Sequence, residues 1–283
     1  MASLTDIFQR PVLWDSLGFS PVALEIGGFA LRWYSLAYIA GIVIGWWLLS
    51  RMITRRSEPP MNTRQLDDLI SWSTLGIIAG GRLGYVIFYD FAAYAAEPLK
   101  ILRLWEGGMS FHGGFAGVLI AAFLYCRKHG LNALRVLDYA AVITPIGLLL
   151  GRLANFVNGE LWGRPTDGTW GIIFPGGGPL PRHPSTLYAA ASEGLLLLVV
   201  LSLLFWATRA RLRPGLLGGV FVGGYGLVRF VLEQFREPDA QLGVLPWGLT
   251  MGQTLCLPMI IVGLWLVWRA LRGGPAGDAR AAA

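Results

Sequence analysis

The chain has 283 residues, of which 54% are hydrophobic and only 14% are charged. Soluble domains carry about 25% charged residues, so this composition excludes an ordinary soluble enzyme and indicates a polytopic membrane protein. The formal net charge of +6 is explained by the Lys and Arg bias of membrane topology, and nucleic-acid binding is not expected.

Seven apolar windows follow one another along the chain, most of them near the roughly 20 residues that a helix needs to cross a bilayer. They are Leu31–Leu49, Leu69–Tyr89, Gly113–Cys126, Leu134–Phe156, Thr186–Ala207, Leu216–Phe235 and Leu249–Trp268, the third being the shortest. Alternating strand-like stretches are few, which argues against a transmembrane barrel. The pattern predicts an all-α bundle of seven transmembrane helices.

The basic residues give this bundle an orientation. If the N-terminus lies outside, the inner connections hold Arg51, Arg55, Arg56, Arg64, Arg127, Lys128, Arg135, Arg209, Arg211, Arg213, Arg269, Arg272 and Arg280. The outer segments hold only Arg10, Arg32, Lys100, Arg103, Arg164, Arg182 and Arg236. Because Lys and Arg concentrate in cytoplasmic connections, we expect the N-terminus outside and the C-terminus inside.

The segments between and beyond the windows complete the predicted organisation. We expect residues 1–30 to form an outer interfacial arm with a short amphipathic helix over Leu4–Leu17. Helices 1–4 are expected over 31–157, with an outer arm at about 90–111, and an outer head segment over 158–185. Helices 5–7 are expected over 186–270, followed by a disordered inner tail over 271–283. The head segment is expected because its Gly- and Pro-rich sequence is too long for a bare connector.

Polar residues gather at the end of the fourth window, in the sequence GRLANFVNGELWG. Arg152 and Asn155 are three residues apart and share a helix face, and Glu160 follows them. A charge at mid-span costs about 2.5–3.5 kcal/mol on insertion scales. Such residues usually line a polar cavity, so this end of the window is a candidate functional site.

Four further polar features fall in the outer half of the predicted bundle. They are Tyr34 in the first window, Arg82 in the second, His112 with Gly113 and Gly114 at the third, and the stripe of Tyr225, Arg229, Glu233 and Arg236 in the sixth. Each has a structural alternative: an aromatic belt, a snorkelling arginine, glycine packing or an ion pair within one helix. Arginines bind phosphate through planar paired hydrogen bonds, and glycine amides at a helix start can approach an anion. Together the features favour a phospholipid head group.

These motifs resemble those of bacterial prolipoprotein diacylglyceryl transferases. The resemblance runs from about Leu31 to Trp268 and includes RWYSLAY, GGRLGY, SFHGGFAG, GRLANFVNGELWG, RHPSTLY, VRFVLEQFREPDAQLG and TMGQTLCLPMI. It implies a multi-pass protein of the bacterial cytoplasmic (inner) membrane. It also implies transfer of the diacylglyceryl group of phosphatidylglycerol to the lipobox cysteine thiol in a prolipoprotein signal peptide, forming a thioether and releasing glycerol phosphate.

The resemblance and the polar pattern together predict the site. His112, Arg152 and Arg229 are predicted as catalytic residues, His112 as the base and the arginines on the phosphate. Substrate binding is predicted for Tyr34, Arg82, Gly113, Gly114, Asn155, Glu160, Gly163, Glu233 and Arg236. Thr186 and Ala189 depart from the family, which commonly has Gln and Glu there, and no role is assigned to His183.

The implied partners are phosphatidylglycerol, prolipoprotein signal peptides and the bilayer, with no cofactor and no metal. Cys126 and Cys256 lack metal-like spacing and are expected to be apolar filler. One alternative is a channel or transporter for an anionic lipid or solute. Another is an intramembrane hydrolase that pairs a serine with His112, although the sequence has no GxSxG motif.

Overall fold

The computed structural model describes residues 11–168, 170–237, 243 and 245–273. The chain divides into two compact units. The first comprises residues 1–48 and 137–283, and the second comprises 49–136. Helix α2 (Trp33–Arg55) and helix α6 (Ala133–Val157) each cross a boundary between them.

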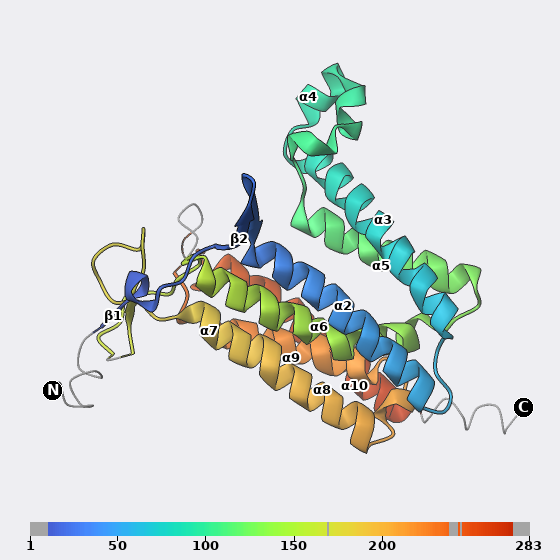
Figure 1. The fold of residues 1–283 in the computed structure, drawn as a ribbon. Coiled ribbons are helices and arrows are strands. Elements are labelled where there is room, and N and C mark those ends of the chain that lie inside the picture. Colours follow the sequence, from blue (N-terminus) through green and yellow to red (C-terminus); the bar gives the residue numbers. More distant parts are fainter. Residues whose placement is uncertain (1–10, 169, 238–242, 244, 274–283) are drawn as a thin grey trace, which may run out of the picture. The chain divides into compact units, whose positions relative to one another are not determined.

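Helices lying side by side make up most of the first unit (Figure 1). After α2 and α6 come α7 (Ser185–Ala189), a π-helical segment η4 (Ala190–Leu196), α8 (Leu197–Ala207), a 3-10 turn η5 (Ala210–Leu212), α9 (Leu216–Leu232) and α10 (Met251–Arg272). Glycines allow close approach between these helices. A Cβ built on Gly263 in α10 would lie 2.4 Å from the Cα of Gly223 in α9, so the two backbones touch and a side chain there would force them apart.

The N-terminal residues of this unit pair with the segment after α6. Strand β1 (Val12–Leu13) lies parallel to β4 (Ile172–Ile173). Trp14 is 6% exposed in a small core with Phe156, Ile172 and Phe174, and its indole N–H donates to the carbonyl of Phe156 at 3.0 Å. An apolar core shared by Trp14, the end of α6 and the β4 region thus holds the segment after α6 on the helices.

The expected amphipathic helix over Leu4–Leu17 is not present in its described part. Residues 1–10 lie outside the described residues, and the rest forms β1 and a 3-10 turn η1 (Trp14–Leu17). Strands β2 (Val22–Ile26) and β3 (Phe29–Arg32) follow as an antiparallel hairpin. Its turn uses Gly27 and Gly28 at φ of +55° and +81°, values that glycine adopts without steric cost. The pairing of Val12–Leu13 with β4, a segment about 160 residues away, explains why the local sequence wrongly suggested a helix there.

The second unit pairs two long helices. They are α3 (Thr63–Phe88) and α5 (Phe111–Lys128), joined by α4 (Phe91–Ala96) and two 3-10 turns, η2 (Pro98–Leu102) and η3 (Leu104–Glu106). A Cβ added to Gly113 of α5 would lie 2.3 Å from the carbonyl oxygen of Gly80 in α3. The glycines of GGRLGY and SFHGG therefore allow backbone contact between the two helices.

Each predicted window overlaps a described helix, or for Thr186–Ala207 the consecutive helical segments α7, η4 and α8, which confirms a helical membrane protein. Four helical stretches are long and apolar enough to cross a bilayer by length and composition: Trp33–Arg55, Ala133–Val157, Ser185–Ala207 and Met251–Arg272. The shorter α9 is also apolar. Its predicted end at Phe235 is wrong, because the helix ends at Leu232. The predicted inner tail lies outside the described residues from residue 274 onward.

Candidate functional site

A buried carboxylate lies at the centre of the polar cluster in the first unit. Glu193 is 0% exposed and belongs to the π-helical segment η4. Such single-turn π-helices widen a helix locally and are frequent at functional sites. The next residue, Gly194, lies against α6, since a Cβ there would be 2.7 Å from the Cα of Leu149. The close approach brings Glu193 within reach of α6.

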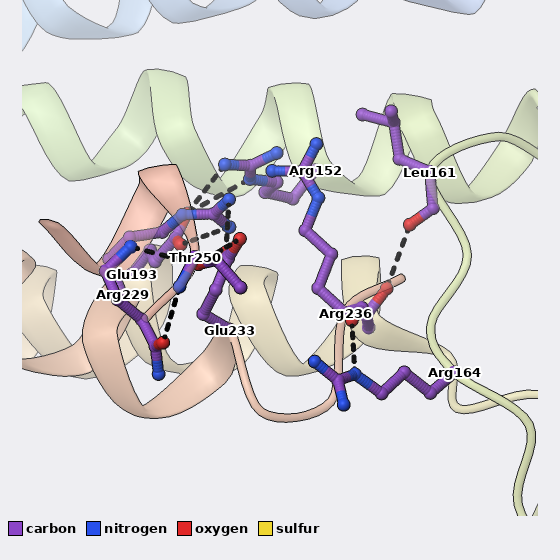
Figure 2. Close-up of polar contacts among 10 residues, drawn as sticks. Arg152, Leu161, Arg164, Glu193, Arg229, Glu233, Arg236 and Thr250 are labelled. Atoms are coloured by element: carbon purple, nitrogen blue, oxygen red, sulfur yellow. Dashed lines mark hydrogen bonds and ion pairs between the residues drawn. The ribbon is translucent and has the colours of Figure 1, made fainter. Parts of the chain in front are cut away.

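Glu193 binds two arginines from different helices (Figure 2). The Nε and Nη2 atoms of Arg152 in α6 are each 3.0 Å from its Oε2. The Nη1 atom of Arg229 in α9 is 3.6 Å from its Oε1. A buried carboxylate is costly unless it is paired, so Glu193 fixes both guanidinium groups in place.

Arg229 is also held by Glu233, one turn later at the end of α9. Its Nη2 atom is 2.9 Å from Oε2 of Glu233, the i, i+4 pair that the sequence spacing predicts. The Thr250 hydroxyl donates to Oε1 of Glu233 at 3.2 Å, and Thr250 caps α10 in a capping box with Gln253. The positive end of the α10 dipole therefore also favours the Glu233 carboxylate.

These arginines open onto a pocket. Its lining consists of Arg152, Leu161, Ser185, Thr186, Ala189, Arg229, Leu232 and Arg236. Arg236 lies beyond the end of α9, where its backbone forms an antiparallel bridge with Gly163 and its carbonyl accepts from Nε of Arg164 at 2.9 Å. The three arginines give the lining a cluster of positive charge beside Glu193 and Glu233, which suits an anionic ligand.

Two further predicted residues bind each other at the end of α6. Glu160 accepts from the side-chain amides of Asn155 at 2.7 Å and Asn158 at 3.3 Å. The carboxylate that binds Arg152 belongs to Glu193 and not to Glu160. Asn155 is 8% exposed. The pair thus fixes the turn that leads from α6 into the head segment.

Gly163 occupies a position without room for a side chain. A Cβ there would lie 2.3 Å from the carbonyl oxygen of Phe235 and 2.7 Å from the Cβ of His183. The Nδ1 atom of His183 is 3.2 Å from the Tyr188 hydroxyl. Burial lowers the pKa of His183, against a smaller opposing effect of the Asp167 charge, so this imidazole is neutral near neutral pH.

Tyr34 lies at the start of α2 and is 37% exposed. Its hydroxyl is 3.3 Å from the hydroxyl of Tyr38, and the two rings meet edge to face at 5.0 Å between centroids. The pair presents phenolic hydroxyls on the helix surface.

The second unit holds the remaining predicted residues. His112 is exposed at the second position of α5, with its ring edge to face with Phe111. The amide of Gly113 donates to the Ser110 hydroxyl at 3.2 Å, and that of Gly114 donates to the Ser110 carbonyl at 2.9 Å. Since both amides are used in capping α5, the contacts give no support to the predicted anion binding by Gly113 and Gly114.

Arg82 is enclosed by the connection between α3 and α5. It is 3% exposed, and its guanidinium donates to the carbonyls of Lys100, Ile101, Arg103, Gly107 and Gly108. A guanidinium has five N–H groups, so these contacts occupy all of them. Arg82 therefore has no donor left for the predicted contact with substrate. The role of its side chain is to hold residues 97–108 together.

We expect the variant Arg82→Lys to loosen this connection, since lysine offers three donors and cannot reach all five carbonyls. Stranded buried carbonyls cost about 1–3 kcal/mol each, so the melting temperature should fall and cleavage by protease should begin within residues 97–108. Arg103→Lys is the control, because Arg103 is 41% exposed and pairs with Glu97 and Glu106 at the surface, where ion pairs contribute about 0–1 kcal/mol. Equal stability of the Arg82→Lys and Arg103→Lys variants would contradict this role.

Sequence reasoning missed the residues that organise the cluster. Glu193 is an isolated acid in an apolar window, and Thr250 is one threonine before a helix. A signal did exist for Thr250, because Thr followed three residues later by Gln predicts a capping box. The described residues contain no group of three His, Cys, Asp or Glu side chains that could hold a metal ion. Both cysteines are free and buried.

Comparisons with known proteins agree on one family. The family model for prolipoprotein diacylglyceryl transferase matches residues 21–269. A phosphatidylglycerol–prolipoprotein diacylglyceryl transferase of Rhodospirillum rubrum is 55% identical over 257 residues, which cover 90% of this chain and 93% of the relative. Relatives of the same name from Zymomonas mobilis and Allorhizobium ampelinum are 54% and 51% identical, over 90% and 97% of this chain and 92% and 96% of theirs.

Proposed function

Because the chain belongs to the prolipoprotein diacylglyceryl transferase family, we propose that its Arg152–Glu193–Arg229 cluster binds the phosphodiester of phosphatidylglycerol during transfer. The chain is a transferase that moves the diacylglyceryl group of phosphatidylglycerol to prolipoproteins. The observation that carries the assignment of the site is Glu193, a fully buried carboxylate that holds two arginines at the edge of one pocket.

The chemistry requires a thiolate and a place for the leaving charge. The sulfur of the substrate cysteine attacks the glycerol carbon that bears the phosphate, the carbon–oxygen bond breaks, and glycerol phosphate leaves with the electron pair. Negative charge then grows on a phosphate oxygen, where Arg152 and Arg229 stabilise it. Both arginines have their orientation fixed before substrate binds, so little reorganisation is needed at the moment of reaction.

The remaining roles follow from residue type and position. His112 accepts the thiol proton, since the thiolate is the nucleophile and an imidazole is a suitable base near neutral pH. Glu233 orients Arg229, and Arg236 adds charge at the pocket. Tyr34, Asn155, Glu160 and Gly163 shape the region that receives the head group and the signal peptide. No step needs a metal or a cofactor.

The membrane arrangement is part of the proposal. Seven helices cross the bacterial cytoplasmic (inner) membrane, the N-terminus outside and the C-terminus inside. The outer side carries two arms, at 1–30 and about 90–111, and the head segment at 158–185. The helices lie over 31–157 and 186–270, and the inner tail over 271–283. The skew of basic residues supports this orientation.

Transfer can be tested directly with the purified protein, phosphatidylglycerol vesicles and a lipobox peptide. We expect the peptide mass to increase by one diacylglyceryl group on its cysteine, with equimolar release of glycerol phosphate. A peptide with Ser in place of that cysteine is the control, because an alcohol is a much weaker nucleophile than a thiolate. Vesicle transport of lipid without a covalent product would favour the channel or transporter alternative.

A further inference from the structure

The start of α7 forms one wall of the arginine pocket. Ser185, Thr186 and Ala189 contribute this wall. All three are nearly enclosed, with Thr186 and Ala189 each 3% exposed. This uncharged wall and the arginines therefore line the same pocket.

The hydroxyl of Thr186 has no hydrogen-bond partner within the part of the chain that the structure describes. Threonines in helices commonly bond the carbonyl four residues earlier, as Thr144 does to Ala140 at 2.8 Å in α6. The neighbouring Ser185 hydroxyl donates to the carbonyl of Leu161 at 2.9 Å. A buried polar group without a partner is destabilising. A ligand in the pocket would supply the hydrogen-bond partner that the Thr186 hydroxyl lacks.

The chemistry of the lining selects the kind of ligand. Arg152, Arg229 and Arg236 can only donate hydrogen bonds, so a group that binds among them must be rich in acceptors. The non-bridging oxygens of a phosphodiester are acceptors that carry negative charge. The Thr186 hydroxyl can donate a hydrogen bond to such an oxygen. The methyl group of Ala189, one turn later, cannot form a hydrogen bond.

We propose that Thr186 is a substrate-binding residue whose hydroxyl donates to a phosphate oxygen of phosphatidylglycerol in the arginine pocket. This inference rests on the proposed function and deepens it, because it names an uncharged contact in the same pocket as the arginines. Thr186 thereby takes part in head-group recognition through its hydroxyl.

The kinetic test compares Thr186→Val, which removes the hydroxyl at nearly constant volume, with Thr186→Ser, which keeps it. A hydrogen bond present in both the ground state and the transition state changes KM with little change in kcat. We expect the KM for phosphatidylglycerol to rise about tenfold in the Val variant, the range for a bond to a charged group, and to return near the wild-type value in the Ser variant. The matched control is Thr144→Val, an exposed position whose hydroxyl bonds its own helix.

Lipid binding distinguishes the contact from general packing. Equilibrium binding is measured with vesicles that carry phosphatidylglycerol, phosphatidic acid or diacylglycerol. The Val variant should bind the first two lipids about tenfold more weakly and diacylglycerol with unchanged affinity. Weaker binding of phosphatidylglycerol alone would place the contact on the head-group glycerol. Equally weaker binding of all three lipids would show that the side chain acts only through packing. Either result overturns the proposal.

The two arms also separate this inference from the proposed function. If the wild type forms the thioether product but the Val variant has the wild-type KM and affinity, Thr186 is not a ligand and the transfer site stands. If the wild type forms no product, the proposed function fails, while the difference between Val and Ser variants in phosphatidic acid binding still decides the contact. Melting temperatures of both variants within a few degrees of wild type verify that the fold is intact.

Discussion

Replacing Arg229 with lysine is expected to lower the rate of diacylglyceryl transfer by about 100-fold or more, the scale for removing one donor from a developing oxyanion. Arg229 uses two different nitrogens, Nη1 at 3.6 Å from Glu193 and Nη2 at 2.9 Å from Glu233. A lysine ammonium is a compact point charge without the planar fork. It can satisfy one carboxylate, but it cannot span both and still offer a donor to phosphate.

Lysine is a sharper probe here than alanine. An alanine at position 229 would leave the buried Glu193 with Arg152 as its remaining partner, and breaking a buried ion pair costs about 3–5 kcal/mol. Loss of activity would then be confounded with loss of folding. The lysine variant keeps the charge, so its melting temperature should stay close to that of the wild type while turnover collapses.

The same substitution at Arg152 should act in the same direction, because its Nε and Nη2 both bind one oxygen of Glu193. Arg209→Lys is the matched control, since Arg209 is exposed after α8. Turnover is measured as thioether product formed per enzyme at saturating lipid and peptide. Wild-type turnover in both the Arg152→Lys and Arg229→Lys variants would reject planar two-point binding of the phosphate.

The sequence was sufficient to predict the helices and to locate Arg152 and Arg229, for a physical reason. Long apolar windows have few alternatives in a bilayer, where every backbone polar group must be satisfied within a helix or a closed sheet. Arg152 and Arg229 are exceptional in such windows, so they could be identified as candidate site residues without coordinates. The i, i+4 pairing of Arg229 with Glu233 follows from helical spacing alone, and the structure contains it.

The parts that could not be predicted depend on contacts between distant segments. Glu193 is 41 residues from Arg152, and its placement depends on a π-helical turn that disrupts the regular helical periodicity on which sequence patterns rely. Arg82 was predicted to bind substrate because its structural partners could not be recognised in the sequence. Those partners are five backbone carbonyls in a connection that has no hydrophobic periodicity. The parallel pairing of β1 with β4 joins segments about 160 residues apart, which local propensity does not encode.

Replacing His112 with glutamine is expected to lower the transfer rate at pH 7 by at least about 100-fold, the lower end of the range for general-base catalysis. The acceptor thiol has an ordinary pKa of about 8.5, so only a few per cent of it is thiolate at pH 7. Glutamine keeps a polar side chain of similar reach but cannot accept the proton. His129→Gln is the control, because His129 is exposed at the opposite end of α5.

The dependence on pH separates a base from a residue that only positions substrate. As the pH rises toward about 8.5, the thiol ionises without help, so the loss caused by His112→Gln should shrink steadily. A loss that stays constant from pH 7 to pH 9 would make His112 a hydrogen-bonding residue, and an unchanged rate would end its catalytic role. An unchanged rate would have a physical explanation, because positive charge near the bound cysteine lowers the pKa of the thiol. The arginines that hold the phosphate would then also supply the thiolate, and the reaction would need no side-chain base.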